Sequence, residues 1–518
     1  MIAGLLAALI AAAIGYLVAG IVAPASGPVA AVAEASIDLT PPPVKNFAVS
    51  TFGTHDKLVL LSGIAVILAL FAAIVGVLAV RQLWYGLAGL ACFAAIGVAA
   101  ALTRPNATSA YLLPTLAGAA AGALALALLA RNAPRAVEAP APRPPAARSA
   151  TPVRYRPAQP PSPERRTFLV TGGVTAGAAA VAYLGGRVLT ESTSVSQAQA
   201  SLRIPRPAHP APPLPAGSDL RIPGLSSFIT PNGSFYRIDT AIVLPEIPPA
   251  NWHLRVHGMV SKEITISFSE LIRRPLTADY ITLTCVSNPV AGPLISNAQW
   301  IGASLASLLR QAGVRAGADQ LLCTSSDGFT SGTPLQVVMD GRDAMLAVAM
   351  NGTALPVEHG FPVRMVVPGL YGYVSACKWI TDIEVTTFAG NAAYWVQRGW
   401  DQQAPIKTEC RIDVPSGGGQ VKPGTTSVAG VAWAQHKGIA AVEVRVDNGP
   451  WHVARLAAVP DIDTWRQFVW DWDATPGQHL IEARATDATG HTQTALQEPP
   501  EPNGASGYPS VSVTVTSG

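Results

Sequence analysis

The sequence predicts a multi-domain protein with an N-terminal all-α transmembrane region, a central α+β domain and a C-terminal all-β immunoglobulin-like sandwich. Three observations predict this order. Apolar runs of roughly 20 residues dominate the chain up to about residue 187. Strand-like and helix-like patterns are mixed over residues 225–408, whereas residues 409–518 consist almost wholly of strand-like segments separated by turn signals. A chain of 518 residues is long enough for about three domains.

Four apolar runs fill residues 1–130, and each is long enough to cross a bilayer as a helix. A fifth, less apolar run covers residues 167–188. The first run has no basic segment before it and is followed by further spans, which favours an anchor helix over the alternative of a cleaved signal peptide. A lipid bilayer is therefore an expected partner, whereas a net charge of +3 gives no indication of nucleic acid binding. The four runs cover about residues 2–22, 58–80, 83–103 and 111–130.

The placement of Lys and Arg predicts the orientation of these spans. The linker at residues 131–166 is rich in Pro and carries eight Arg against two Glu, and Arg81 lies between two spans. These loops should be cytoplasmic, so five spans put the rest of the chain outside the cytoplasm, as a multi-pass protein of the cell membrane. Arg165 and Arg166, followed by Thr-Phe-Leu, resemble a twin-arginine export signal, with an ordinary positive-inside flank as the alternative.

Both Pro-rich linkers, residues 131–166 and 189–224, are predicted to be extended spacers because they cannot bury enough apolar surface to fold. In the central domain, Leu305, Leu308 and Leu309 share one face of a predicted helix that Gly313 can end. The strands that we expect there are Trp252–Val260, Glu263–Phe268, Ile281–Cys285, Gln336–Val338 and Val363–Val367. In the C-terminal domain we expect a sandwich core built from Trp433, Trp465, Trp470 and Trp472.

The stretch from His359 to Trp379 places a His, an Arg and a Lys among turns rich in Gly and Pro. Arg364 and Lys378 are cations of the kind that hold phosphate, and glycines let backbone amides approach an anion. The stretch therefore favours a site for a phosphorylated cofactor. A buried strand flanked by solvated cations is the alternative.

Cys285 is the cysteine with the most suggestive position among the five in the chain. It ends the strand-like run YITLTC and enters a polar loop, where a thiolate is well placed as a soft metal ligand or a nucleophile. A buried structural cysteine is the alternative. The odd number and the spacing of the cysteines indicate neither a zinc site nor a dense disulfide framework.

Residues 225–518 resemble the sulfite-oxidase superfamily of molybdopterin-dependent oxidoreductases, in the form of a membrane-anchored bacterial member. Four stretches carry the resemblance in the family's order: ITPNGSFYR from Ile229, LTCVSN around Cys285, MNGTALPVEHGFPVR from Met350 and YGYVSACKW from Tyr371. The resemblance implies a molybdenum–molybdopterin cofactor. It also implies that residues 409–518 form a dimerisation domain and that the protein is a homodimer.

The resemblance further implies a role for nine residues. Cys285 would be the thiolate ligand of the metal and the catalytic residue. Three residues would line the pterin, one would contact it from another loop, and four would grip the phosphate; in this order they are Asn232, Tyr236 and Arg237, then Ser325, then His359, Arg364, Ser375 and Lys378.

Two departures from the family pattern bear on the substrate. Sulfite-oxidising members carry an Arg shortly after the metal cysteine, where this chain has Val286-Ser287-Asn288-Pro289, and a Tyr where it has Val348. A pocket without these two groups should bind sulfite poorly. The exported bacterial branch, which includes a methionine-sulfoxide reductase, lacks them too. We therefore expect oxygen-atom transfer in the direction of S-oxide or N-oxide reduction, with sulfite oxidation as the alternative.

The electrons for such a reaction are expected to come from a separate electron-transfer partner. None of the nine His lies within a predicted span, and the chain has no Cys-x-x-Cys-His motif, so no haem is expected in it. The spans would then anchor the enzyme or dock that partner. A cofactor-free scaffold on a decayed oxidoreductase fold is the alternative of another class, against which the retained Cys285, Arg364 and Lys378 argue.

Overall fold

The structure, a computed structural model, describes residues 1–41, 44, 47, 56–105, 107–133, 163–192 and 195–516. The chain divides into two compact units. One comprises residues 1–193 with 241–243, and the other comprises residues 194–240 with 244–518. Most of the first predicted linker, residues 134–162, lies outside the described residues.

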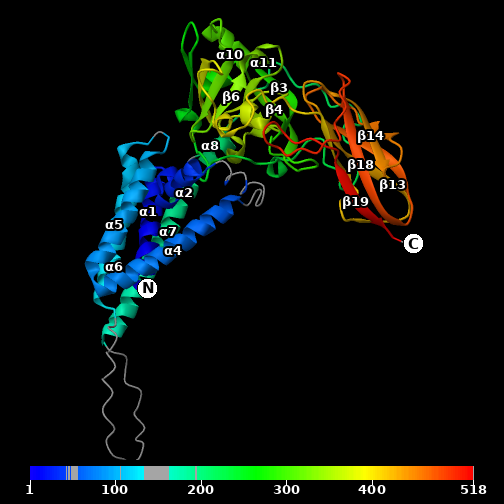
Figure 1. The fold of residues 1–518 in the computed structure, drawn as a ribbon. Coiled ribbons are helices and arrows are strands. Elements are labelled where there is room, and N and C mark those ends of the chain that lie inside the picture. The colour runs from blue at the N-terminus through cyan, green and yellow to red at the C-terminus, as the bar shows by residue number, and fades with distance from the viewer. Residues whose placement is uncertain are drawn as a thin grey trace, which may run out of the picture. The chain divides into compact units, whose positions relative to one another are not determined.

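The first unit is a bundle of helices, drawn in blue to cyan-green in Figure 1. Five helices in the described part of the chain are long and apolar enough to cross a membrane, at the places where the sequence predicts spans. The short helix α2, which follows the first of them, was not predicted. Arg104, after α5, pairs with Glu34 and Asp38 of α2 at 3.4 and 3.0 Å. The helices are α1 (Ile2–Val22), α2 (Pro28–Leu39), α4 (Asp56–Arg81), α5 (Leu83–Leu102), α6 (Leu112–Arg131) and α7 (Pro163–Ser192).

Small residues bring the helices of this unit into close contact. A Cβ added to Gly4 of α1 would lie 1.8 Å from the backbone oxygen of Ala72 in α4, and one on Gly118 of α6 would lie 2.5 Å from that of Ala11 in α1. Helices approach this closely only where side chains are absent, which is how helices associate in a bilayer. The first helix is thus a packed member of the bundle.

The central part of the second unit contains two five-stranded sheets. In the first, the order is β2-β1-β10-β5-β6, and β1 and β10 run parallel although they are more than 120 residues apart. These strands are β1 (His253–Gly258), β2 (Ile264–Ser267), β5 (Gln320–Ser325), β6 (Thr330–Pro334) and β10 (Ile380–Thr386). In the second, the order is β3-β4-β7-β8 and β9 also pairs with β7, with β3 (Leu276–Thr284), β4 (Ile295–Ser304), β7 (Met345–Met350), β8 (Thr353–Ala354) and β9 (Arg364–Val366).

Short helices connect these strands. The helix α10 is capped by Gly313 at a φ of 70°, as its leucine spacing and the glycine predict. The strand predicted at Gln336–Val338 is wrong, because these residues form α11 instead. Three residues are too few to separate a strand from one helical turn, and tertiary packing decided between them. The helices are α8 (Val195–Ser201), α9 (Phe268–Ile272), α10 (Leu305–Ala312), α11 (Leu335–Met339) and α12 (Gly372–Ser375).

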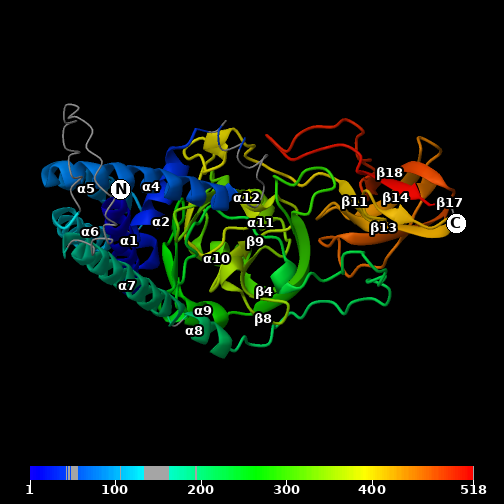
Figure 2. The same cartoon turned by 90° about the horizontal axis from the view of Figure 1, so that it is seen from below.

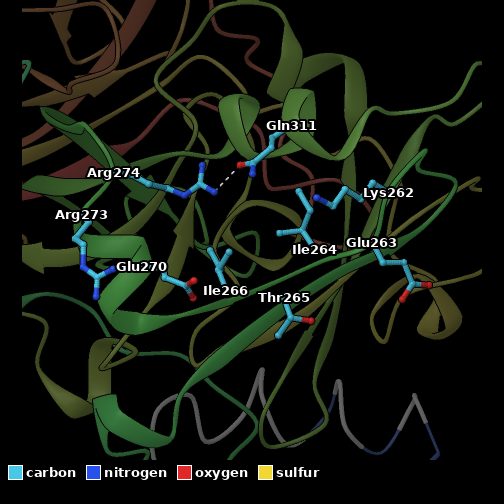
Figure 3. Close-up of a pocket in the computed structure, with 9 residues that line it drawn as sticks. All are labelled: Lys262, Glu263, Ile264, Thr265, Ile266, Glu270, Arg273, Arg274 and Gln311. Atoms are coloured by element: carbon cyan, nitrogen blue, oxygen red, sulfur yellow. Dashed lines mark hydrogen bonds between the residues drawn. The ribbon is translucent and has the colours of Figure 1, made fainter.

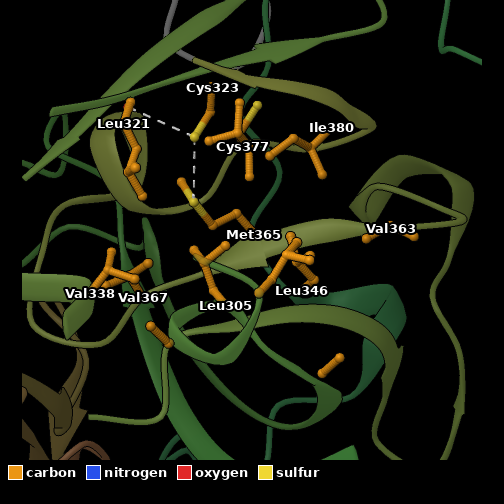
Figure 4. Close-up of a cluster of buried hydrophobic side chains, with 14 of the residues drawn as sticks. Leu305, Leu321, Cys323, Val338, Leu346, Val363, Met365, Val367, Cys377 and Ile380 are labelled. Carbon is orange, nitrogen blue, oxygen red and sulfur yellow. Dashed lines mark hydrogen bonds between the residues drawn. The ribbon is translucent and has the colours of Figure 1, made fainter. Parts of the chain in front are cut away.

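The core between the two central sheets is rich in sulfur. Figure 4 shows Cys323, Cys377 and Met365 surrounded by aliphatic side chains, and the Cys323 Sγ lies 3.8 Å from the Met365 Sδ. Burial raises the pKa of Cys323 to about 12 and that of Cys377 well above its usual value. These two cysteines are therefore protonated packing residues.

The C-terminal strands, orange to red in Figures 1 and 2, form two sheets whose facing side chains make a core of their own. Trp472 belongs to that core, but Trp433 and Trp465 belong to the central core instead. The sequence prediction that these tryptophans fill the sandwich is thus wrong for two of the four. The sheet orders are β11-β13-β17-β16 and β12-β19-β18-β14-β15, with β11 (Glu409–Val414), β12 (Gln420–Val421), β13 (Gly424–Trp433), β14 (Ile439–Val446), β15 (His452–Val453), β16 (Arg455–Leu456), β17 (Arg466–Ala474), β18 (Gly477–Asp487) and β19 (Ser510–Val515).

Strand β3 is held by the C-terminal domain. The Gln435 side chain donates to the Thr282 carbonyl at 3.1 Å and to the Thr284 hydroxyl at 3.0 Å. The Trp465 N–H donates to the Thr282 hydroxyl at 2.7 Å. Because Cys285 follows β3 directly, the position of its backbone depends on contacts with residues 150 or more positions later in the chain.

Part of the second predicted linker, residues 189–224, packs on the central domain, which corrects our expectation of a free spacer. The backbone of His209 forms hydrogen bonds of 3.1 and 2.8 Å with β3. Leu202 and Ile204 pack against the central core. The prolines of this stretch keep it extended without preventing these contacts, because an extended chain can lie along a sheet edge.

Asp279 of β3 gives the junction of the two β domains an expected pH dependence. It is 4% exposed, and burial, reinforced by Asp461, Asp343 and Asp463, raises its pKa to about 7. A carboxyl whose pKa is raised by folding stabilises the fold fully below its unfolded value of about 4, and this stability is lost as the pH rises through 7.

We expect Asp279→Asn to be more stable than the parent at pH 8, by a few kcal/mol at roughly 1.4 kcal/mol per pKa unit, and nearly equal to it at pH 4. The amide oxygen can still accept the 2.8 Å hydrogen bond from the Tyr280 N–H. Unfolding midpoints of the detergent-solubilised full chain across this pH range would measure the difference. The exposed Asp473→Asn is the matched control, and a difference that does not change with pH would contradict the assignment.

Candidate active site

One cavity brings together six of the nine predicted site residues. Its walls come from the loop after β3, the end of β5, the turn before β9 and the loop between α12 and β10. The six residues are Tyr236, Cys285, Ser325, His359, Arg364 and Lys378. The other three, Asn232, Arg237 and Ser375, lie beside the cavity and do not line it.

Cys285 lies in the cavity wall at the start of a tightly hydrogen-bonded loop. Its N–H donates to the Leu294 carbonyl at 2.9 Å, and its own carbonyl accepts from the Asn288 N–H at 3.1 Å. Only 8% of the residue is exposed, and burial raises the pKa of its thiol. The free thiol is therefore protonated at neutral pH, and a soft cation that replaces the proton would hold it as a thiolate.

The backbone of α12 closes over this loop. A Cβ added to Gly372 would lie 3.5 Å from the Tyr236 hydroxyl and 3.6 Å from the Thr284 carbonyl. The first turn of α12 thus lies next to Thr284, the residue before Cys285. Burial, and after it the nearby Cys285, raises the pKa of Tyr236, so its hydroxyl keeps its proton.

Arg364 is a buried cation without an acidic partner in the described part of the chain. It is 5% exposed, and its guanidinium donates only to carbonyls, those of Met365, His359 and Ala376, at 3.2–3.5 Å. It also lies 4.9 Å from the centre of the Trp300 ring. Burial lowers its pKa to about 10. Since an unpaired buried charge is costly, this arrangement favours an anionic ligand.

Lys378, by contrast, already has an acidic partner. Its Nζ lies 2.8 Å from Asp239, which also accepts from Arg237 at 3.0 Å, and it donates to the Glu358 carbonyl at 3.1 Å. Burial lowers the pKa of Lys378 to about 8, although Asp239 opposes the shift. Asp239 therefore sets the charge at this end of the cavity, and nothing in the sequence apart from its place two residues after Arg237 indicates it.

His359 fixes the neighbouring loop. Its Nε2 lies 3.1 Å from the Asn232 carbonyl, so this nitrogen carries the proton and donates. Burial and the nearby Arg364 lower its pKa to about 4, which keeps the ring neutral. Its edge-to-face contact with Phe235, at 5.3 Å, holds the ring in place. In this arrangement His359 acts on the loop at residue 232 and not as a free cation.

The side chains of Asn232 and Ser375 are engaged within the protein. The Asn232 amide donates to the Thr353 hydroxyl at 3.2 Å and accepts from the Asn351 amide at 2.7 Å. The Ser375 hydroxyl donates to the Leu370 carbonyl at 2.9 Å. Both residues therefore shape the turns around the cavity.

Sequence reasoning missed the apolar part of the cavity. Four aromatic residues, Phe329, Tyr373, Trp395 and Trp400, line it together with the half-buried Asp327. Tyr373 lies within the stretch YGYVSACKW but looks there like an ordinary core aromatic, and the other three come from two segments outside the quoted stretches.

A second cavity lies beside the edge strand β2 (Figure 3) and contains none of the predicted site residues. Its acidic groups already have partners: Glu263 pairs with Arg255 at 2.9 Å and Glu270 caps α9 through Ser267. We assign the chemistry to the cavity at Cys285.

The donor set at Cys285 fits a metal that arrives with its own ligands. The described residues contain no group of three or more His, Cys, Asp or Glu side chains placed to hold a metal ion. One soft sulfur donor in the same cavity as an anion site at Arg364 matches a metal bound mainly by the sulfurs of a phosphorylated organic cofactor.

Comparison with known proteins agrees with this chemistry. Residues 241–395 match the family described as oxidoreductase molybdopterin binding domain. Sulfite oxidase from Gallus gallus is 30% identical over 292 residues, which cover 47% of this chain and 62% of that protein. The uncharacterized oxidoreductase YuiH from Bacillus subtilis is 30% identical over 149 residues, which cover 29% of this chain and 72% of that protein.

A solved structure, the sulfane dehydrogenase SoxCD from Paracoccus pantotrophus, has a TM-score of 0.49 at 24% identity, over 56% of this chain and 84% of that chain. The match to sulfite oxidase covers 53% of the Mus musculus protein and 50% of the Homo sapiens protein. The chain thus spans about half the length of these curated relatives.

Proposed function

Because the chain belongs to the sulfite-oxidase superfamily of molybdopterin-binding oxidoreductases, we propose that it reduces an organic S-oxide or N-oxide by oxygen-atom transfer. In the balanced reaction, a sulfoxide takes up two electrons and two protons and yields the corresponding sulfide and one water molecule. The S=O bond breaks, and the released oxygen forms the two O–H bonds of that water. The molybdenum–molybdopterin cofactor supplies the two-electron oxygen-atom chemistry when bound.

We infer reduction of an oxide, and not oxidation of sulfite, from the residues that line the cavity beside Cys285. Val286 and Ser287 line the cavity there, and neither offers a positive charge to an inorganic oxyanion. Val348, where sulfite-oxidising members have a tyrosine, is fully buried. Sulfite would lose its hydration on entering the cavity, and no positive charge next to the thiolate would replace it, which is unfavourable. A neutral oxide loses far less hydration on entering such a site.

In this proposal each of the chain's own groups has a defined task. Cys285 holds the metal by its thiolate. Arg364, aided by Lys378, holds the phosphate end of the cofactor, and His359 with Asn232 fixes the loop next to it. The Tyr236 hydroxyl, which keeps its proton, lines the cavity and can donate a hydrogen bond there. Two tryptophans that line the cavity, Trp395 and Trp400, exclude water from the reacting atoms.

We further propose that the five long apolar helices anchor the protein in the cell membrane and that the cavity faces the extracytoplasmic side. Arg165 and Arg166, both exposed at the start of α7, support export by the twin-arginine route. With no His in these five helices, electrons would come from a separate electron-transfer partner. The facing sheets of the C-terminal domain support an immunoglobulin-like sandwich, through which a homodimer would form.

The test uses the full chain purified from a host that makes molybdopterin. We expect about one molybdenum per chain, a Mo(V) paramagnetic signal and no haem absorbance. Oxidation of reduced methyl viologen by methyl phenyl sulfoxide or trimethylamine N-oxide should exceed sulfite-dependent ferricyanide reduction. Faster turnover with sulfite would overturn the proposed direction, and protein without molybdenum would overturn the whole proposal.

A further inference from the structure

Four aromatic side chains that line the cavity are linked by ring contacts. We call Phe329, Tyr373, Trp395 and Trp400 the aromatic wall. The ring centres of Trp395 and Trp400 are 6.2 Å apart, and those of Tyr373 and Trp400 are 6.0 Å apart. Tyr394 links Phe329 to Trp395, with ring centres 5.7 and 5.2 Å away. These distances are those of interacting aromatic pairs.

Hydrogen bonds hold the aromatic wall in place. The Tyr373 hydroxyl donates to the Asp401 carbonyl at 2.5 Å, and the Trp400 N–H of the backbone donates to the Trp395 carbonyl at 3.2 Å. The Arg398 guanidinium lies over the ring of Tyr394, 3.6 Å from its centre. Since the hydroxyl of Tyr373 is used up, this residue offers the cavity its ring.

The aromatic wall lies close to the proposed metal ligand. Tyr373 follows Gly372, where an added Cβ would lie in ordinary van der Waals contact with the Tyr236 hydroxyl at 3.5 Å and the Thr284 carbonyl at 3.6 Å. Thr284 is the residue before Cys285, so the first turn of α12 carries Tyr373 to the reacting end of the cavity. The charged groups Arg364 and Lys378 belong to the cofactor's phosphate end. A substrate at Cys285 therefore meets rings on one side and an aliphatic residue, Val286, beside the thiolate.

One polar group of the aromatic wall has no partner in the described part of the chain. The indole Nε1 of Trp400 is enclosed and makes no hydrogen bond there, and the residue is 9% exposed. An enclosed donor without a partner costs free energy, and this cost is removed when an acceptor atom of a bound molecule takes up the hydrogen bond.

We propose that the substrate is an organic sulfoxide whose apolar substituent, alkyl or aryl, lies against the aromatic wall while its S=O oxygen faces the metal at Cys285. This inference rests on the proposed function and narrows its substrate class. Rings favour apolar groups by area and by ring contact, and thioether sulfur also packs well on aromatic edges. The thioether product of a sulfoxide gains this sulfur–ring contact, whereas the amine product of an N-oxide does not.

The experiment compares two sulfoxides that share the reacting group and differ in the substituent. With reduced methyl viologen as electron donor, methyl phenyl sulfoxide is expected to have at least tenfold higher kcat/KM than dimethyl sulfoxide. In Trp400→Ala this ratio should fall about tenfold, which corresponds to 1.4 kcal/mol. Trp400→Phe, which keeps a ring, should retain most of the ratio. Trp451→Ala, in the C-terminal domain and outside the cavity, is the control and should leave the ratio unchanged.

A measurement on the parent protein avoids any dependence on the folding of a variant. Methyl phenyl sulfide, the product, should inhibit at a concentration at least tenfold lower than dimethyl sulfide does. Equal inhibition by both sulfides, or an unchanged ratio in molybdenum-loaded Trp400→Ala, would overturn the aromatic wall as the substituent site. A higher kcat/KM for trimethylamine N-oxide than for either sulfoxide would overturn the sulfoxide class.

These outcomes are separate from a failure of the proposed function. A molybdenum-loaded parent that reduces no organic oxide would refute the oxide reductase itself. A parent that reduces all oxides without regard to their substituents would leave the reductase standing and refute only the role of the aromatic wall.

Discussion

Replacing Cys285 by alanine is expected to abolish turnover, with kcat lowered by several orders of magnitude. Cys285 is the one cysteine among the described residues that line the cavity. Cys323 and Cys377 lie in the core, where burial strongly raises the pKa of their thiols. Without a thiolate the metal would lose its soft protein ligand, and its reduction potential, which this ligand helps to set, would change. Reduced methyl viologen oxidation, molybdenum content and the Mo(V) signal would measure the effect.

Cys323→Ala is the matched control for this experiment. It removes another buried thiol from the same domain and should keep turnover at a small cost in stability. Full activity of Cys285→Ala at normal molybdenum content would refute the assignment of the metal ligand.

Replacing Arg364 by methionine is expected to have opposite effects on the cofactor and on the empty protein. The molybdenum content should fall at least tenfold, because the cofactor's phosphate would lose its contact with Arg364. Among the described residues that line the cavity, Arg364 is the one cation that has no acidic partner. The empty protein should be as stable as the parent or more stable, because replacing an uncompensated buried charge by an apolar side chain is neutral or favourable by about 1–4 kcal/mol.

Lys378→Met provides the contrast. It takes a cation away from the buried Asp239 carboxylate at 2.8 Å, so the empty protein should be less stable than the parent. Both variants would be made in a host without molybdopterin synthesis and their unfolding midpoints compared with that of the parent. The midpoint should be unchanged or higher for Arg364→Met and lower for Lys378→Met. A clear loss of stability in empty Arg364→Met would mean that this guanidinium supports the fold by itself and would contradict its assignment as a ligand-binding cation.

The local features of this fold could be predicted from the sequence because they depend on neighbouring residues. Leucine spacing and Gly313 predicted α10, and apolar length predicted the five long helices, as the structure confirms. The wrong prediction of a strand at Gln336–Val338 also has a local cause. A segment of three residues is too short for its hydrophobic pattern to distinguish a strand from a helix. The tryptophans Trp433 and Trp465 were assigned to the wrong core because sequence position says nothing about which domain a side chain faces.

The site could be predicted only as far as motifs reached. Arg364 and Lys378 lie in one recognisable stretch, but the contact of Lys378 with Asp239 joins residues 139 positions apart. It exists because β10 follows Lys378 directly and pairs with β1, which no local pattern indicates. The aromatic wall is of the same kind, since Phe329, Tyr373 and Trp400 meet only in the finished fold. Such groups become visible when topology is known.

The contacts between β3 and the C-terminal domain have a consequence for the order of biosynthesis. The strand before Cys285 is completed by Gln435 and Trp465, which leave the ribosome about 150 to 180 residues later. We therefore expect the cofactor to enter only after translation of the whole second unit, when the helices of the first unit have long been made. Maturation of this enzyme would then be limited by the last domain to be synthesised, and truncations at the C-terminus should accumulate as metal-free chains.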